Sequence, residues 1–224
     1  MQKLEDLLVD ARIEWPNGKS EYFVPIDKFE RIVTVDTVLA ELKRCRFELS
    51  GKDEDALREF AETVYRTCRR LFTILAYFGH AHSIGDFLKD SIHDEHLPFL
   101  RHSTIGKNGI YKLFSETWES QKAFECTENW DRRSVEDLFR DQWAFLAPEF
   151  KRYVDGDNDP IIEHKELKPN CVLPFVKDME YSDKRHEGGF SIVWEVKIHP
   201  AHHKLLPGAE SKVDAVQIKL SDRC

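Results

Sequence analysis

The chain contains no long run of apolar residues. Its longest apolar run, residues 71–78, is interrupted by Thr73, whereas a helix that crosses a bilayer needs about 20 predominantly apolar residues. The amino terminus, Met1-Gln2-Lys3-Leu4-Glu5-Asp6, is charged and lacks the apolar core of a secretion signal. We therefore expect an intracellular, cytoplasmic protein with no membrane partner.

Positive charge and closely spaced cysteines are also scarce. The 33 lysines and arginines are outnumbered by 41 aspartates and glutamates, which gives a formal net charge of -8. An acidic chain repels phosphate backbones, so we expect no nucleic-acid partner. The five cysteines are scattered and form no Cys-x-x-Cys pair, which favours reduced thiols in the core over a zinc site or a disulfide framework.

Aromatic and aliphatic residues are plentiful, and over the first two thirds of the chain they follow a helical pattern. Apolar residues make up 41% of the chain, including 15 phenylalanines and five tryptophans, which is enough to build a core. They recur at three- and four-residue steps, the spacing of amphipathic helices, over residues 35–47, 53–78, 83–91 and 134–146. We therefore expect residues 1–155 to form a mainly α-helical domain.

Local signals refine this helical domain. Ser83 and Ser134 are the expected N-caps of the two later helices, because their hydroxyl groups can accept bonds from unpaired backbone amides. Gly79 is suited to end the helix predicted over residues 53–78. Asn108-Gly109 is a favourable tight-turn dipeptide, so a small hairpin is predicted over residues 105–114.

The pattern changes after Phe150. Asp155-Gly156-Asp157-Asn158-Asp159-Pro160 is polar and rich in turn residues, and we place a linker at residues 156–171. Residues 172–176 are expected to form an extended edge segment, because Pro174 excludes a central strand. Alternating apolar and polar residues then predict strands over residues 190–198 and 213–220. The expected fold is α+β, with a helical domain followed by antiparallel strands. Because so few strands need a covered face, either residues absent from this sequence or the helical domain must bury them.

One segment of the strand region resembles the nucleotide-binding loop of protein kinases. In that loop, glycines between two antiparallel strands let backbone amides approach the ATP phosphates, a valine packs on the adenine, and a lysine on the next strand pairs with the phosphates. Glu187-Gly188-Gly189-Phe190-Ser191-Ile192-Val193 is similar to the loop, and Val216-Gln217-Ile218-Lys219 is similar to the lysine strand. His186 and Ser191 stand where the first and third glycines of the loop would be.

The resemblance extends beyond this loop to a group of filamentous-fungal protein kinase-like proteins, in which a helical region precedes the kinase domain. Val172-Leu173-Pro174-Phe175 and the stretch from Val196 to His203 are similar to that group. Residues 10–16 and Arg140-Asp141-Gln142-Trp143 are similar to it as well. The resemblance implies that residues 172–224 are the opening strands of a kinase small lobe.

What the resemblance implies about function is limited to nucleotide binding. The ATP-binding residues carried over from the kinase motifs are Gly188, Gly189, Phe190, Ser191, Val193 and Lys219. In a shifted register, Ala215-Val216-Gln217 would instead put Gln217 where the lysine belongs. The sequence has no His-Arg-Asp catalytic loop and no Asp-Phe-Gly metal motif, so we assign no catalytic residue, and Mg²⁺ is expected only if the missing kinase region is present.

Three interpretations are compatible with the sequence. A serine/threonine kinase-like chain that is inactive alone is the leading hypothesis. The alternative is a non-enzymatic interaction protein, whose helical domain binds a protein partner. A third reading is an unrelated α+β protein in which the Gly-Gly-Phe segment occurs by chance. No metal ligand is assigned, because the closely spaced His199, His202 and His203 lack a helical spacing with a carboxylate or cysteine partner.

Overall fold

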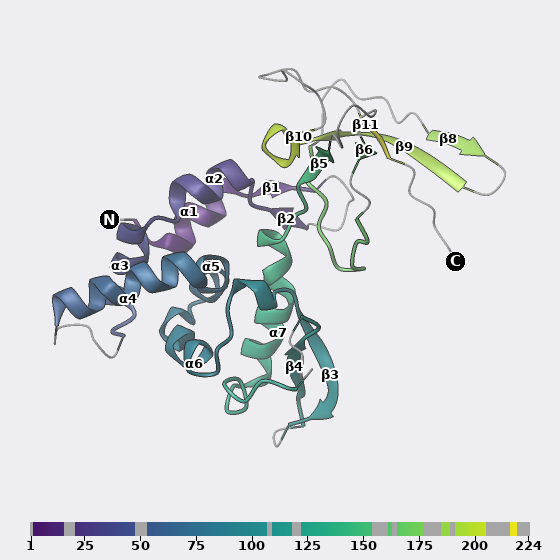
Figure 1. Ribbon diagram of the computed structural model, residues 1–224. Helices are drawn as coiled ribbons and strands as arrows, with labels where there is room; N and C mark the ends of the chain where they lie inside the picture. The colour runs from purple at the N-terminus through teal and green to yellow at the C-terminus, as the bar shows by residue number, and fades with distance from the viewer. Residues whose placement is uncertain are drawn as a thin grey trace. The chain divides into compact units, whose positions relative to one another are not determined.

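The protein has a mixed α/β fold with short, mostly antiparallel strand pairs. The computed structural model describes residues 2–15, 21–47, 53–106, 109–117, 122–153, 161–162, 165–176, 185–188, 191–204 and 216–218 (Figure 1). The chain divides into two compact units, Met1–Ala11 with Lys28–Phe145 and Arg12–Asp27 with Leu146–Cys224. This grouping differs from the sequence-based division near residue 155, because residues 12–27 belong with the C-terminal unit.

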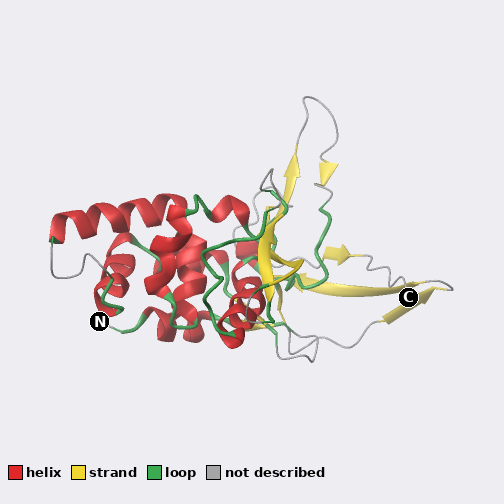
Figure 2. Cartoon of the chain, turned by 90° about the horizontal axis from the view of Figure 1, so that it is seen from below, coloured by secondary structure: helices red, strands yellow, loops and turns green. Residues whose placement is uncertain are grey.

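Most helices belong to the first unit and most strands to the second. Figure 2 colours the helices red and the strands yellow. The α-helices are α1 (Leu4–Ala11), α2 (Ile26–Ile32), α3 (Val35–Arg44), α4 (Glu54–Thr67), α5 (Arg69–Tyr77), α6 (Ile84–Lys89) and α7 (Arg132–Asp141). Short 3₁₀ turns follow at η1 (Ala81–Ser83), η2 (Asp94–His96), η3 (Gln142–Phe145) and η4 (Pro200–His202). Residues 71–76 of α5 are all buried, as the nearly continuous apolar run in this segment predicts.

The helix predicted over residues 53–78 is in fact two helices. α4 ends and α5 begins at Cys68, whose φ of -134° and ψ of 28° are not helical. The prediction of one helix was wrong because α5 has an N-terminal cap that its own sequence does not reveal. The Asp94 carboxylate accepts hydrogen bonds from the backbone amides of Arg70 and Leu71, both at 2.8 Å. Gly79 follows α5 with a left-handed φ of +83°, as predicted for a residue that ends a helix.

Two predicted N-caps are also corrected. The N-cap of α7 is Asp131, not Ser134, because the Asp131 carboxylate accepts from the backbone amide of Ser134 at 3.1 Å. Ser134 therefore lies inside the first turn. Ser83 precedes α6 but makes no side-chain cap bond. The helix predicted over residues 83–91 is present as the shorter α6, which η1 precedes.

The predicted hairpin is present in the first unit, although its strands begin earlier than expected. Strands β3 (Phe99–Ile105) and β4 (Tyr111–Ser115) pair antiparallel, with Ile105 opposite Tyr111 and Phe99 opposite Ser115. Gly109 in the turn has a φ of +70°, which a side chain would strain.

The second unit is built from short strands. They are β1 (Ile13–Glu14), β2 (Tyr22–Phe23), β5 (Phe150–Tyr153), β6 (Ile161–Ile162), β7 (Phe175–Val176), β8 (Arg185–Gly188), β9 (Ser191–Ile198), β10 (His203–Lys204) and β11 (Val216–Ile218). β1 pairs with β2, and β5 lies between β6 and a parallel β10. β6 falls within the predicted linker 156–171, so part of that segment is paired to β5 instead of serving as a plain connection.

The core of the second unit gathers around the end of β9. Leu173, Phe175 and Ile198 are buried together, and Trp15, Phe150 and Cys171 pack against them. Phe175 of β7 is opposite Ile198 of β9. The apolar strand 190–198 predicted from its alternating pattern is therefore anchored at its carboxyl end by burial. Among the described residues, no helix is long and apolar enough to cross a membrane.

Candidate functional site

The segment that resembles a kinase nucleotide-binding loop is a tight antiparallel hairpin. β8 and β9 pair with Gly188 opposite Ser191, so only Gly189 and Phe190 separate the two strands. Val193 lies two residues further along β9, opposite His186. Gly189 and Phe190 themselves lie outside the described residues, as does Lys219.

The third strand of this sheet comes from the segment that resembles the kinase lysine strand. β11 pairs antiparallel with β9, with Gln217 opposite Glu195 and Ile218 opposite Trp194. Trp194 is also opposite Arg185 of β8, so β8 and β11 lie on opposite edges of β9. The backbone thus brings Gly188, Ser191 and Val193 into one sheet with the strand that precedes Lys219.

A histidine-rich turn follows β9 directly. His199 begins it, and its Nδ1 accepts a hydrogen bond from the backbone amide of Ala201 at 3.2 Å. The backbone amide of His199 donates to the carbonyl of Pro174 at 2.8 Å, which ties the turn to the start of β7. The side chain of His202 is buried and uses both ring nitrogens, with Nε2 3.1 Å from the amide nitrogen of Ile26 and Nδ1 3.1 Å from the carbonyl oxygen of Pro148. His202 therefore offers no free ring nitrogen to a metal.

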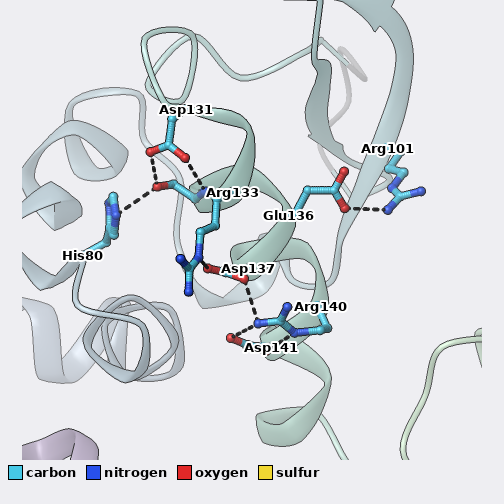
Figure 3. A network of polar contacts seen from close by, with 9 residues as sticks. His80, Arg101, Asp131, Arg133, Glu136, Asp137, Arg140 and Asp141 are labelled. Carbon is cyan, nitrogen blue, oxygen red and sulfur yellow. Dashed lines mark hydrogen bonds and ion pairs between the residues drawn. The ribbon is translucent and has the colours of Figure 1, made fainter.

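In the first unit, a polar network runs along one face of α7 (Figure 3). Arg140 donates to Asp141 at 2.7 and 3.0 Å and lies 2.8 Å from Asp137, which also pairs with Arg133 at 3.6 Å. Glu136 accepts from Arg101 at 3.3 Å. With Glu5, Phe78 and Gly79, this face lines an open hollow of about 560 Å³.

Opposite charges in this network largely satisfy one another. Burial raises the pKa of Asp141, against the lowering effect of the bonded Arg140. The Asp141 bond in turn raises the pKa of Arg140 above its ordinary value. Positive and negative side chains follow one another on α7 at helical three- and four-residue spacing, first Arg132 and Arg133, then Glu136 and Asp137. This is the usual arrangement of a solvated helix face. The network organises the surface of α7 without presenting a reacting group.

A serine, a histidine and an aspartate also meet at the start of α7, but in the wrong order for catalysis. The Ser134 hydroxyl donates to the Asp131 carboxylate at 2.7 Å, and its oxygen lies 3.1 Å from Nε2 of His80. Since the hydroxyl proton is used by Asp131, His80 acts as the donor, whereas a nucleophilic serine needs a histidine that accepts its proton. Ser134 is also buried. Burial lowers the pKa of His80, with His82 adding to the effect.

One cluster in the first unit has the residue types of a metal site. The ligand atoms of His93, Glu95 and His96 lie within 4.8 Å of one another. However, Nδ1 of His96 accepts a hydrogen bond from the backbone amide of His93 at 2.9 Å. The proton of the neutral ring is then on Nε2, so metal binding there requires the ring to change tautomer and give up this bond. The cluster is better suited to holding η2 than to holding an ion.

The four described cysteines are all free thiols, as predicted. Burial raises the pKa of Cys68 and of Cys171 to about 11. It also raises the pKa of Cys45 and, more strongly, that of Cys126. Because the thiolate is the nucleophile, these residues are poorly suited to covalent catalysis.

Comparison with known protein families, curated proteins and solved structures finds no match for this chain. The candidate site is therefore defined by its own backbone arrangement and by the motifs of its sequence.

Proposed function

We propose that β8, β9 and β11 form the phosphate-binding end of a kinase-like nucleotide-binding sheet, and that the chain binds ATP without transferring its phosphate. The observation that carries this proposal is the position of β9 between β8 and β11, with a two-residue Gly189-Phe190 connection on the β8 side. In protein kinases a glycine-rich loop between two strands covers the ATP phosphates, and a lysine on the next strand contacts them.

The ladder includes two residues that depart from the kinase pattern. His186 replaces the first glycine, and its backbone is paired in the ladder opposite Val193. Extended backbone is open to any residue, so glycine is not required at that position. Ser191 replaces the third glycine and is the first residue of β9.

The proposed role of each residue follows from the motif. Gly188 and Gly189 allow backbone amides to approach the phosphates, and Val193 packs against the adenine. Lys219, the next residue after β11, pairs with the α- and β-phosphates. Without a His-Arg-Asp loop to supply the base and an Asp-Phe-Gly motif to hold Mg²⁺, these residues bind nucleotide and lower no chemical barrier.

The test is the affinity of the purified chain for ATP, measured by calorimetric titration and by the rise in melting temperature at millimolar ATP. Lys219→Ala is expected to weaken binding at least tenfold. Lys204→Ala removes the same charge from an exposed side chain that pairs with Glu149 in the second unit, and it should bind within about twofold of the parent. Absence of binding by the folded parent chain overturns the proposal, and the helical unit then becomes the place to seek a protein partner.

Gln217→Lys distinguishes the two registers. If Lys219 holds the phosphates, adding a second lysine at residue 217 leaves the Lys219→Ala variant weak. If the shifted register applies, Gln217→Lys alone tightens ATP binding and Lys219→Ala has no effect.

A further inference from the structure

A single buried histidine, His202, joins two distant segments of the second unit. Its side chain is only 2% exposed. Its Nε2 lies 3.1 Å from the backbone nitrogen of Ile26, and its Nδ1 lies 3.1 Å from the carbonyl oxygen of Pro148. Ile26 is the first residue of α2, so its amide has no partner inside the helix. His202 supplies that partner from a turn far along the sequence.

Only one protonation state of His202 satisfies both contacts. A carbonyl oxygen only accepts, so the proton must be on Nδ1, facing Pro148. A backbone amide only donates, so Nε2 must be unprotonated, facing Ile26. A second proton, which turns the ring into a cation, would occupy Nε2. Two donors would then face each other at the start of α2, and the bond to Ile26 would be lost.

We propose that His202 is a proton-sensitive clasp, whose protonation releases the start of α2 from the turn that follows β9 while the bond to Pro148 is kept. The same turn carries His199, whose amide is bonded to Pro174 ahead of β7. Opening the clasp therefore loosens the start of α2 from the turn at the carboxyl end of β9. This inference does not depend on nucleotide binding.

The groups around the ring favour the neutral form on balance. The ring of Phe23 meets His202 edge-on, with 5.5 Å between centroids, and the ring of His199 lies 5.9 Å away. The Pro148 carbonyl, which accepts from Nδ1, favours the charged form, as do the carboxylates of Asp27 and Glu149. Glu149 is itself paired with two lysines, Lys151 at 3.0 Å and Lys204 at 3.2 Å, which offsets its charge. Burial is the largest influence and lowers the pKa of His202 below its ordinary value.

The direction of the pH effect follows from this lowered pKa. When the clasp opens, the exposed ring regains an ordinary pKa of about 6.5 and takes up a proton that the closed ring refuses. The clasp is fully effective above about pH 6.5, and its stabilisation is lost as the pH falls toward the pKa of the closed form. Between pH 7.5 and 5.5 the equilibrium constant for opening should rise by up to about tenfold.

The experiment is hydrogen exchange of the Ile26 amide in the full chain, followed by NMR from pH 7.5 to 5.0 and divided by the intrinsic exchange rate at each pH. We expect the opening constant to rise several-fold below pH 6.5 in the parent chain. His202→Gln, which does not titrate, should open more at pH 7.5 and show a flat profile. His82→Gln, which removes an exposed histidine of the first unit, should keep the parent's profile.

A rise of less than twofold in the parent chain, or an unchanged profile in His202→Gln, overturns the proposal. If His202→Gln does not fold, the ring of the parent chain still decides the question. NMR of its nitrogens at pH 7.5 should show a proton on Nδ1 and none on Nε2, and the opposite tautomer contradicts the clasp.

Discussion

The side chain of Gln142 pairs with the backbone of Phe99 through two hydrogen bonds. Its Oε1 accepts from the Phe99 amide at 2.7 Å, and its Nε2 donates to the Phe99 carbonyl at 2.9 Å. Both Gln142 and Phe99 are fully buried. The glutamine thus takes the place of a neighbouring strand at the start of β3, and it gives a structural role to one residue of the Arg140-Asp141-Gln142-Trp143 segment.

Replacing Gln142 with alanine should destabilise the first unit by about 2–4 kcal/mol, because two buried backbone groups lose their partners at once. Gln142→Glu keeps the acceptor for the Phe99 amide and loses the donor, so it should also be destabilising. Urea unfolding gives the comparison. A loss below about 0.5 kcal/mol for the alanine variant would mean that water replaces the glutamine and that the pairing contributes little.

The helical part of the fold was largely predictable because its apolar residues repeat at helical spacing. The break at Cys68 was not, since the bonds that begin α5 come from Asp94, 24 residues further along the chain. Asp131 as the cap of α7 was missed for a different reason. Both Asp131 and Ser134 are good capping residues, and sequence alone does not rank them.

The candidate site was predictable only as far as local patterns reach. The alternating residues of 190–198 predicted β9. The pairing of β11 with the opposite edge of β9 was not predicted, because no local signal in residues 213–220 specifies a partner strand. The role of His202 was not predictable, because its two partners, Ile26 and Pro148, are distant in sequence and offer only backbone atoms.

The two hydrogen bonds that Asp94 accepts should stabilise the start of α5. Asp94→Ala removes the acceptors for the amides of Arg70 and Leu71 and should cost about 1–2 kcal/mol, the usual effect of losing a cap. Asp94→Asn retains one acceptor. It also carries no charge, whereas the carboxyl of Asp94 is buried, and this burial raises its pKa. It should therefore cost less than the alanine variant in urea unfolding. An alanine variant as stable as the parent would show that α5 begins without this cap.

Substitution of Gly79 reports on the left-handed backbone conformation alone, because a side chain there meets no steric clash. A methyl group added there would meet no atom within 4 Å, but the φ of +83° disfavours any side chain. We expect Gly79→Ala to lose about 1 kcal/mol, and Gly79→Asn to lose less, because asparagine tolerates left-handed conformations better. The order of the two melting temperatures is the measurement. If alanine is tolerated as well as asparagine, the left-handed end of α5 is not retained in solution.

The buried thiols should resist alkylation in the folded protein. A pKa of about 11 for Cys68 and Cys171, compared with an ordinary 9.0, leaves about one hundredth of the usual thiolate at pH 7.5. Iodoacetamide labelling, read for each cysteine by mass spectrometry, should therefore modify these two residues at least about 100-fold more slowly than after unfolding in urea. Because Cys68 is fully buried and Cys171 only partly, exclusion of the reagent should slow Cys68 further. Labelling of Cys68 at the unfolded rate would contradict the burial of this side chain at the junction of α4 and α5.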